Sequence, residues 1–432
     1  MSRGMSTEML LALAIFIITY VLISIRRFRW FNVERPMVAL LGAGLMIIFG
    51  VVGPEEALQA IDLNTLALLL GMMILVACLE VCGFFTWVSL LIISRSRNQF
   101  QFLVLVMIAT AVLSAIILND TVVLLFTPIV IKTCRLIKAD PIPYMVALAV
   151  SANIGSVATP VGNPQNAYIA TESGISFLDF STAMVPVAVV SMLVAIALIW
   201  LVFRKQLCDD GARRSRSIDA RMTPSMIDFK GMDRAIWVVL GVLAAVIVGF
   251  LVSPSLGVPL AIVAFVGGSI ALFLVPLFNR RTNAKSILRG VDWTLLLFFV
   301  GLFIVLKGVA TSGLLQEMED FFQSVSNGGL STIPGLSVFS AVLSNLISNV
   351  PAVILLAPFV EQLGQTSLWL ALAASSTLAG NATILGAAAN VIVAESGEKL
   401  GVELSFWKFV KAGLPITIAT LIISIIILEL LF

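Results

Sequence analysis

Long apolar segments, separated by short polar or charged ones, recur along the whole chain. Most of them have the roughly 20 residues that an α-helix needs to cross the hydrocarbon core of a bilayer. The pattern predicts an all-α polytopic membrane protein with five crossings in each half of the chain. The predicted crossings cover residues 9–25, 37–52, 62–80, 143–172, 180–203, 235–252, 259–278, 292–310, 367–395 and 409–432.

Two further apolar segments, 100–135 and 333–363, are each interrupted midway by an asparagine that is followed by a proline. Basic residues flank both ends of the first segment, and acidic residues flank the second. If both chain termini are extracytoplasmic, every Lys and Arg except Arg3 and Lys307 falls on the cytoplasmic side, as the positive-inside rule requires. We therefore predict two re-entrant hairpins that enter the membrane from opposite faces.

Residues 151–166, SANIGSVATPVGNPQN, lie within an apolar stretch but carry many hydroxyl and amide side chains. Pro160 and Pro164 lack an N–H, so the helix is expected to break near residues 159–164. Unwound backbone at membrane depth is tolerated only inside protein or beside a watery cavity. The stretch therefore predicts a binding site, and a kinked packing helix is the plainer alternative.

The two halves of the sequence resemble one another. The segment 158–166, ATPVGNPQN, aligns with 382–390, ATILGAAAN, and shares with it Ala, Thr, Gly and the final Asn. Further pairs at a constant offset are Asp62 and Asp292, Gly71 and Gly301, Gly83 and Gly313, Asn119 and Asn349, and Pro128 and Pro358. Because each half has an odd number of crossings, the copies form two inverted repeats, each with a re-entrant hairpin and a broken helix. The predicted division is 1–204, a cytoplasmic linker over 205–234, and 235–432.

Inverted repeats with interrupted helices place a substrate site where the repeats meet. We expect the hairpin tips and the breaks to line it, because half-helix N-termini favour anions and the opposite ends favour cations. The predicted substrate-binding residues are Asn119, Thr121, Asn153, Thr159, Gly162, Asn163, Asn166, Asn349, Asn381, Thr383, Gly386 and Asn390.

Asp120 is the predicted ion-coupling residue, because a carboxylate at this depth is costly and is usually functional. It would carry a proton or hold Na⁺ together with Asn153 and Thr159. A helix N-cap is the simpler role for this aspartate. Glu80 and Lys307 also lie within apolar segments, and their long side chains can reach the membrane interface, which accounts for their charge there.

Composition agrees with this reading and limits the alternatives. The chain is 60% hydrophobic and 12% charged, and it contains no histidine. The cysteines show no metal-binding or disulfide spacing. No phosphate-binding motif is present, so ATP is not the direct energy source of this chain. Neither a cofactor, apart from a coupling Na⁺, nor a nucleic-acid partner is expected.

The two motifs SANIGSVATPVGNPQN and NDTVVLLFTPIVI (119–131) resemble those of the ion transporter superfamily. That superfamily includes arsenite/antimonite pumps, divalent anion:sodium symporters, citrate–metal transporters and a family of Na⁺/H⁺ antiporters. The resemblance implies a scaffold domain, a mobile transport domain with elevator-like alternating access, and often a homodimer. The tip Asn119-Asp120-Thr121 is more similar to the arsenite-pump branch than to the Ser-Asn-Thr tips of dicarboxylate symporters.

We therefore predict a multi-pass inner-membrane secondary transporter, not an enzyme. Its cargo would be a small anion or oxyacid, either inorganic such as arsenite or a carboxylate, and its coupling ion H⁺ or Na⁺. The main alternative is a Na⁺(Li⁺)/H⁺ antiporter that uses Asp120 and no anion. A passive channel would also use re-entrant loops, but it would not accumulate its solute. An intramembrane enzyme would need convergent catalytic groups, which this sequence lacks.

Overall fold

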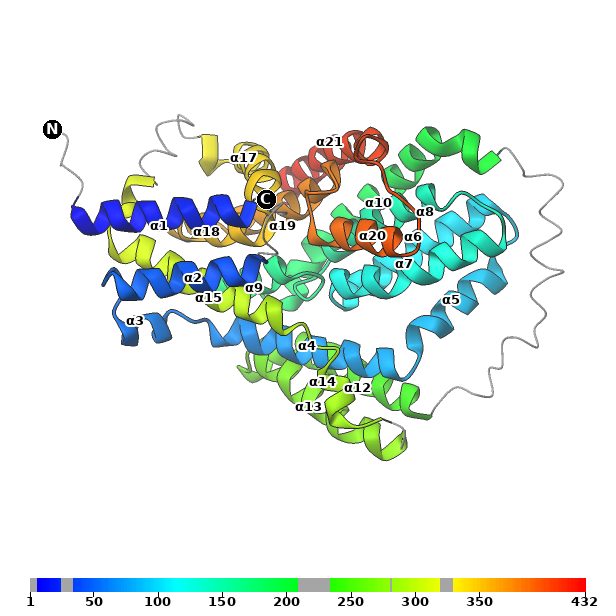
Figure 1. Cartoon of the computed structure of the whole chain (residues 1–432), viewed down its shortest axis with the longest axis horizontal. Coiled ribbons are helices and arrows are strands. Elements are labelled where there is room, and N and C mark those ends of the chain that lie inside the picture. Colours follow the sequence, from blue (N-terminus) through cyan, green and yellow to red (C-terminus); the bar gives the residue numbers. More distant parts are fainter. Residues whose placement is uncertain (1–5, 25–33, 209–233, 280–281, 319–328) are drawn as a thin grey trace.

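The computed structural model describes residues 6–24, 34–208, 234–279, 282–318 and 329–432. Every regular element in these ranges is a helix, as predicted. Eight helices are long and apolar enough to cross a membrane, and they pack side by side (Figure 1). The prediction of an all-helical, multi-pass membrane protein is confirmed.

The helices of the first half follow the predicted crossings closely. They are α1 (Thr7–Ser24), α2 (Arg35–Ile48), α4 (Leu63–Val81), the interrupted pair α8 (Pro141–Ser156) and α9 (Pro164–Ser173), and α10 (Phe177–Cys208). Helix α10 continues past the predicted boundary at residue 204, and residues 209–233 of the predicted linker lie outside the described residues.

The second half gives the same order of elements. It contains α12 (Arg234–Leu256), α13 (Leu260–Phe278), α15 (Trp293–Thr311), the interrupted pair α19 (Thr366–Ala379) and α20 (Ala388–Lys399), and α21 (Phe406–Leu431). A 3-10 turn, η4 (Gly380–Ala382), follows α19 at its break. The short helices α3 (Pro54–Gln59) and α14 (Ala284–Leu288) and the longer α5 (Phe84–Arg95) were not among the predicted elements.

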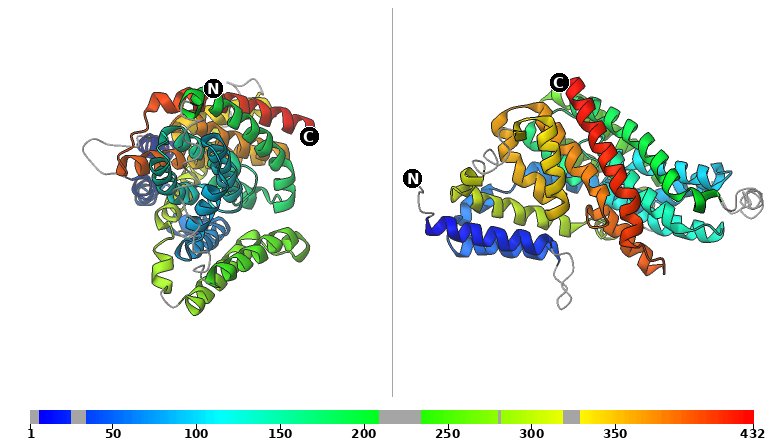
Figure 2. Two further views of the ribbon diagram at one scale, coloured as in Figure 1. Left: turned by 90° about the vertical axis from the view of Figure 1, so that its right-hand side faces the viewer. Right: turned by 90° about the horizontal axis from the view of Figure 1, so that it is seen from above.

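Each asparagine-interrupted segment folds as two helices joined by a tight connection. The first pair is α6 (Gln99–Ile116) and α7 (Asn119–Leu136); the second is α17 (Ile333–Ile347) and α18 (Asn349–Leu363). The two pairs lie toward opposite ends of the long axis in Figure 1 and in the right-hand view of Figure 2. Their connections meet near the centre, where both contribute to one cavity. Helix α6 is by itself long and apolar enough to cross a membrane. The segment is a hairpin because the chain turns after α6 into α7.

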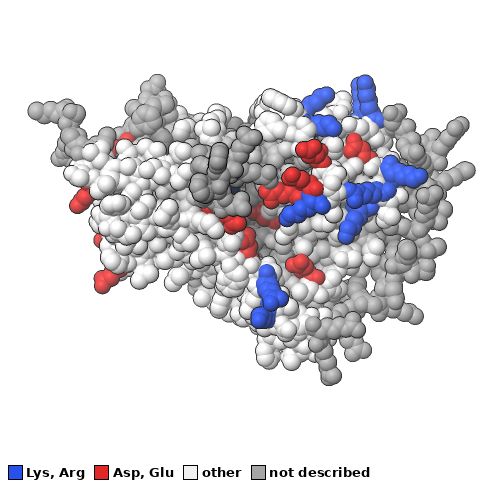
Figure 3. Space-filling view, viewed as in Figure 1, with Lys and Arg blue, Asp and Glu red and all other residues white. Residues whose placement is uncertain are grey.

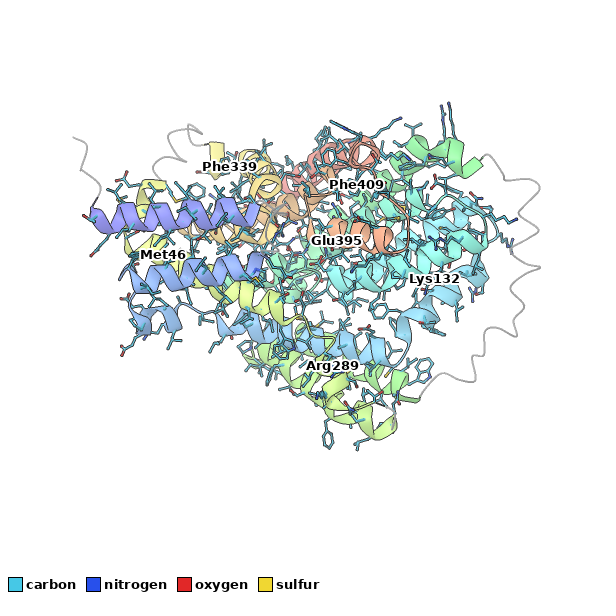
Figure 4. All side chains as sticks on the ribbon, in the orientation of Figure 1. Met46, Lys132, Arg289, Phe339, Glu395 and Phe409 are labelled. Atoms are coloured by element: carbon cyan, nitrogen blue, oxygen red, sulfur yellow. The ribbon has the colours of Figure 1, made fainter. Side chains whose placement is uncertain are left out.

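Glycines set two of the closest helix contacts. A Cβ added to Gly71 of α4 would lie 2.3 Å from the backbone of Ala264 in α13, and one added to Gly301 of α15 would lie 2.5 Å from the backbone of Ala39 in α2. Only glycine allows helix backbones to approach so closely. Met46, labelled in Figure 4, is fully buried where α2 packs on α15. Thus the paired glycines of the sequence repeat perform the same task in both halves.

Charge is distributed unevenly along the molecule. On the face drawn in Figure 3, Lys and Arg gather mainly toward the end that holds α5 to α8, whereas the opposite end carries Asp and Glu. Exposed apolar side chains cover the outer helices between them, for example Leu193 of α10, Phe273 of α13 and Ile422 of α21. This combination is expected of a body that is surrounded by lipid and has unlike charge at its two ends.

Candidate functional site

The break between α8 and α9 is held open by the amide of Asn166. Its Nδ2 donates to the carbonyls of Ser156 and Thr159, each at 3.1 Å. These carbonyls lose their helical partners where the helix unwinds around Pro160. Because a buried carbonyl without a partner is costly, Asn166 stabilises the unwound backbone.

The break between α19 and α20 repeats this arrangement residue for residue. Asn390 Nδ2 donates to the carbonyls of Gly380 and Thr383 at 2.7 and 2.9 Å. In the alignment of the two halves, Asn390, Gly380 and Thr383 stand where Asn166, Ser156 and Thr159 stand. The correspondence seen in the sequence therefore extends to individual hydrogen bonds.

Each hairpin tip is attached to the glycine of its own break. The backbone N–H of Asn119 donates to the Gly162 carbonyl at 2.9 Å. The side chain of Asn349 donates to the Gly386 carbonyl at 3.2 Å and to that of Ser376 at 3.0 Å, in the amide orientation that satisfies both groups. Hence each tip and its break form one polar unit within an apolar body.

Asn153 joins the two units. Its Oδ1 accepts from Asn119 Nδ2 at 3.3 Å, and its Nδ2 donates to Asn381 Oδ1 at 2.9 Å and to Asn390 Oδ1 at 3.0 Å. Two buried atoms in this network, Asn119 Oδ1 and Asn381 Nδ2, have no partner among the described residues. Such atoms are usually satisfied by water, an ion or a ligand.

A cavity of about 200 Å³, here called the central cavity, lies where the two tips meet. It is smaller than the roughly 300–1,000 Å³ of pockets for drug-sized ligands, so it suits a small solute. Its lining comes from the first turns, or the residues just before them, of α2, α7, α9, α15, α18 and α20. The polar or charged lining residues are Arg35, Asn119, Asp120, Gln165, Asp292, Thr294, Ser348 and Asn349.

The convergence of helix N-termini determines the electrostatics of this cavity. Each N-terminus carries a partial positive charge, which attracts oxygen atoms and anions, although Asn163 and Asp292 already cap α9 and α15. Against this, the side chains supply two carboxylates, Asp120 and Asp292, and one guanidinium, Arg35. The central cavity thus offers hydrogen-bond donors to an oxygen-rich solute and one excess carboxylate to a cation.

Asp120 is the second residue of α7, and its carboxylate accepts a hydrogen bond from the backbone N–H of Ala389. That N–H belongs to the first turn of α20, whose N-cap residue is Ala387 and has no capping side chain. In the first half the corresponding residue, Asn163, caps α9 by accepting from the N–H of Asn166 at 2.8 Å. Asp120 therefore replaces, from the opposite half, the cap that the second half has lost.

The predicted site residues fall into two groups. Asn119, Asp120 and Asn349 line the central cavity. Other predicted residues are not among the lining residues, and their side chains bond to other protein groups: Asn153, Thr159, Asn163, Asn166, Asn381 and Asn390. The carbonyls of Gly162 and Gly386 accept from the two tips. Thr383 supplies a carbonyl to Asn390, and Thr121 is not among the lining residues.

The three residues of the predicted Na⁺ site differ in the same way, and the site itself stays a prediction. Thr159 Oγ1 donates to the Ala115 carbonyl at 2.5 Å, and both ends of the Asn153 amide are engaged by other asparagines. Of the predicted set, Asp120 is the one that faces the central cavity. No group of three His, Cys, Asp or Glu residues suited to a metal ion occurs in the described part of the chain.

Arg35 and Asp292 were not among the predicted site residues. Arg35 belongs to a run of basic residues that reads as a cytoplasmic loop, and Asp292 reads as a helix N-cap. Asp292 is such a cap, accepting from the Leu295 N–H at 3.1 Å, but it also lines the central cavity. Nothing local in the sequence places Arg35 beside the second hairpin tip, because that contact joins residues far apart in the chain.

Comparison with known proteins shows what class of protein carries this site. A family model described as citrate transporter matches residues 20–379, most of the chain. The chain belongs to the citrate transporter family. It is 31% identical to a silicon efflux transporter of Oryza sativa subsp. japonica, with 91% of this chain and 92% of the relative covered. It is 30% identical to an uncharacterized transporter of Mycobacterium tuberculosis, with 97% and 98% covered.

A third relative, a putative arsB transporter of Dictyostelium discoideum, is 26% identical, with 91% of this chain and 87% of the relative covered. Among solved structures, the YdaH transporter of Alcanivorax borkumensis matches 98% of both chains with a TM-score of 0.59 and 15% identity. That likeness shows a shared fold. Membership of the citrate transporter family confirms the prediction of a membrane transporter, and the resemblance to the wider superfamily is confirmed with it.

Proposed function

We propose that this member of the citrate transporter family moves a small oxygen-rich solute through the central cavity and couples the movement to H⁺ or Na⁺ at Asp120. The solute class is a hydroxylated oxyacid or small anion, and the relative named as a silicon efflux transporter supports a small inorganic solute. The observation that carries this proposal is the convergence of helix N-termini on one small cavity that also holds the half-buried carboxylate of Asp120.

The size and charge of the central cavity favour a compact, singly charged or neutral solute over a large polyanion. A tricarboxylate brings three negative charges, whereas the lining side chains supply one guanidinium and two carboxylates. Like charges at close range in a poorly solvated site are strongly unfavourable. A hydroxylated oxyacid is small, and its hydroxyls both donate and accept, so it suits carboxylate, amide and N–H groups together.

The position of Asp120 supports ion coupling, because its carboxylate lines the cavity and few protein groups bond to it. The Ala389 N–H donates to the carboxylate, and Asp292 and Arg35 line the same cavity. Binding of H⁺ or Na⁺ at Asp120 removes the excess negative charge of the cavity. Loading of the ion then changes how strongly the cavity holds the oxygen atoms of the solute, which is the coupling that a symporter or antiporter requires.

We propose alternating access in an elevator-like manner, with Na⁺(Li⁺)/H⁺ antiport as the second candidate function. The elevator is supported by the hairpins and breaks, which bond to one another as one polar unit. Antiport is supported by Asp120 alone and would make no use of the N-termini as oxygen-binding groups. The two candidates therefore differ in whether a solute besides the cation is bound.

Reconstituted protein in liposomes distinguishes them. Arsenous acid, silicic acid and citrate are offered in turn under an imposed gradient of either Na⁺ or H⁺, and solute flux and internal pH are recorded. The proposal expects flux of a small oxyacid that one of the two gradients drives. Cation-dependent pH changes that no solute affects would contradict it and establish the antiporter.

A further inference from the structure

Arg35 is the first residue of α2 and reaches the second hairpin tip. Its Nη1 donates to Ser348 Oγ at 3.2 Å, and Arg35 lines the central cavity together with Asn119 and Asp120. A guanidinium carries five N–H donors, and this bond uses one of them.

The two carboxylates of the cavity are both committed to helix N-termini. Asp292 Oδ1 accepts from Thr294 Oγ1 at 2.5 Å and from the Leu295 N–H at 3.1 Å, and Asp120 accepts from the Ala389 N–H. Arg35 lines the same cavity as both carboxylates. Its hydrogen-bond partner at the tip is a neutral hydroxyl, so this bond does not neutralise the charge of the guanidinium.

The first hairpin tip supplies the complementary chemistry. The Asp120 carboxylate lines the cavity and accepts, whereas Arg35 can only donate. The neighbouring Asn119 Oδ1 is a buried acceptor without a partner among the described residues. A solute that donates from one oxygen and accepts at another would bond to both Asp120 and Arg35, as a hydroxylated oxyacid does.

We propose that Arg35 is a solute-binding residue whose guanidinium donates to an acceptor oxygen of a hydroxylated oxyacid held against the first hairpin tip. The inference rests on the proposed function and deepens it by naming how one side of the solute is recognised. Guanidinium bonds to an electron-rich oxygen are charge-assisted and are stronger than those between neutral groups. Since α2 packs on α15, and the tips pack on the breaks, the site is complete only when these two groups of helices are together.

A purely structural role is the competing explanation, because Arg35 would then only hold the second tip through Ser348. Ser348 has a φ of 81°, a backbone conformation that residues other than glycine rarely adopt. The variant Ser348→Ala removes the bond but keeps the guanidinium. Arg35→Gln removes the charge, Arg35→Lys keeps a charge with a different geometry, and Arg95→Gln alters an exposed arginine outside the cavity.

The test measures thermal stabilisation of the purified full-length protein by arsenous acid, and separately by NaCl. We expect the arsenous acid concentration for half-maximal stabilisation to rise about tenfold or more in Arg35→Gln and less in Arg35→Lys, because a point charge replaces the fork of donors. Arg95→Gln is expected to stay within about twofold of the wild type. Ser348→Ala alters a cavity-lining hydroxyl but keeps the guanidinium, so we expect it to lose clearly less than Arg35→Gln. The response to NaCl is expected to be preserved in Arg35→Lys.

Equal responses of wild type and Arg35→Lys to arsenous acid would overturn the inference even if Arg35→Gln does not fold. A loss in Ser348→Ala as large as that in Arg35→Gln would also overturn it and assign Arg35 to the structural role. A wild type that responds to NaCl, but to neither arsenous nor silicic acid, contradicts the proposed solute class itself and the inference with it. The first two outcomes disprove the binding role of Arg35, and the third disproves the proposed solute class.

Discussion

The two breaks are built alike but differ in chemistry. Asn166 and Asn390 satisfy equivalent carbonyls, and the Gly162 and Gly386 carbonyls each accept from the asparagine of their own tip, through its backbone N–H in the first half and its side chain in the second. Only the first half, however, places a carboxylate at its tip and an asparagine at the start of the following half-helix. Both halves retain the residues that keep the backbone unwound. The residues that we propose to bind the solute and the coupling ion are needed only once, and they are present in the first half.

The largest effects are expected where the halves agree. Asn166→Leu and Asn390→Leu each leave two buried carbonyls without a donor, and each orphaned group costs roughly 1–3 kcal/mol. We expect both variants to lose most of their folded protein. Size-exclusion profiles and thermal unfolding in detergent measure this loss, and full stability of either variant would show that its amide does not hold the break.

Asp120→Asn is expected to abolish coupled transport, by about 100-fold or more, while folding is retained. The asparagine oxygen still accepts from the Ala389 N–H, so the cap of α20 survives but the charge is lost. Asp120→Ala removes both and should also lower the free energy of unfolding by about 0.5–2 kcal/mol. Gradient-driven flux in proteoliposomes and thermal unfolding are the two readouts. Coupled flux in Asp120→Asn at the wild-type rate would remove Asp120 from the mechanism.

Gly162→Ala and Gly386→Ala test the close approach at the two breaks. The added Cβ would lie 2.3 Å from the Ser156 carbonyl oxygen and 2.5 Å from the Gly380 oxygen, so the backbone must shift. Overpacking of this kind costs about 1–3 kcal/mol. Gly44→Ala in α2 is the matched control, because nothing lies within 4 Å of its added Cβ. A glycine variant as stable as this control would contradict the predicted contact.

The smallest effects are expected where the halves differ in capping. Asn163→Ala removes the cap of α9 and should cost about 0.5–2 kcal/mol of unfolding free energy. Ala387→Asn gives α20 a cap of its own. We expect the double variant to be as stable as Asp120→Ala or slightly more stable. Thermal unfolding of the single and double variants measures the pair. Destabilisation of Asp120→Ala by the added asparagine would argue against Asp120 as the cap of α20.

The sequence predicted the helices and the breaks because length, apolar content and proline are local properties. Among the predicted site residues, it did not separate Asn119, Asp120 and Asn349, which line the cavity, from those behind them. Asn153, Asn163 and Asn166 bond to the backbone and to other amides, and this distinction depends on tertiary contacts. The position of Arg35 at the cavity was not predicted, because its neighbours along the chain indicate a loop and its partner, Ser348, is distant in sequence.

The central claim is that two halves of opposite orientation bring their hairpin tips together inside the membrane. Single cysteines at Arg135, at the end of α7, and at Glu361, near the end of α18, report it directly in a background without the native cysteines. The measurement is labelling by a membrane-impermeant thiol reagent from each side of sealed vesicles. We predict labelling of the two positions from opposite sides. Labelling of both from the same side would contradict the inverted arrangement.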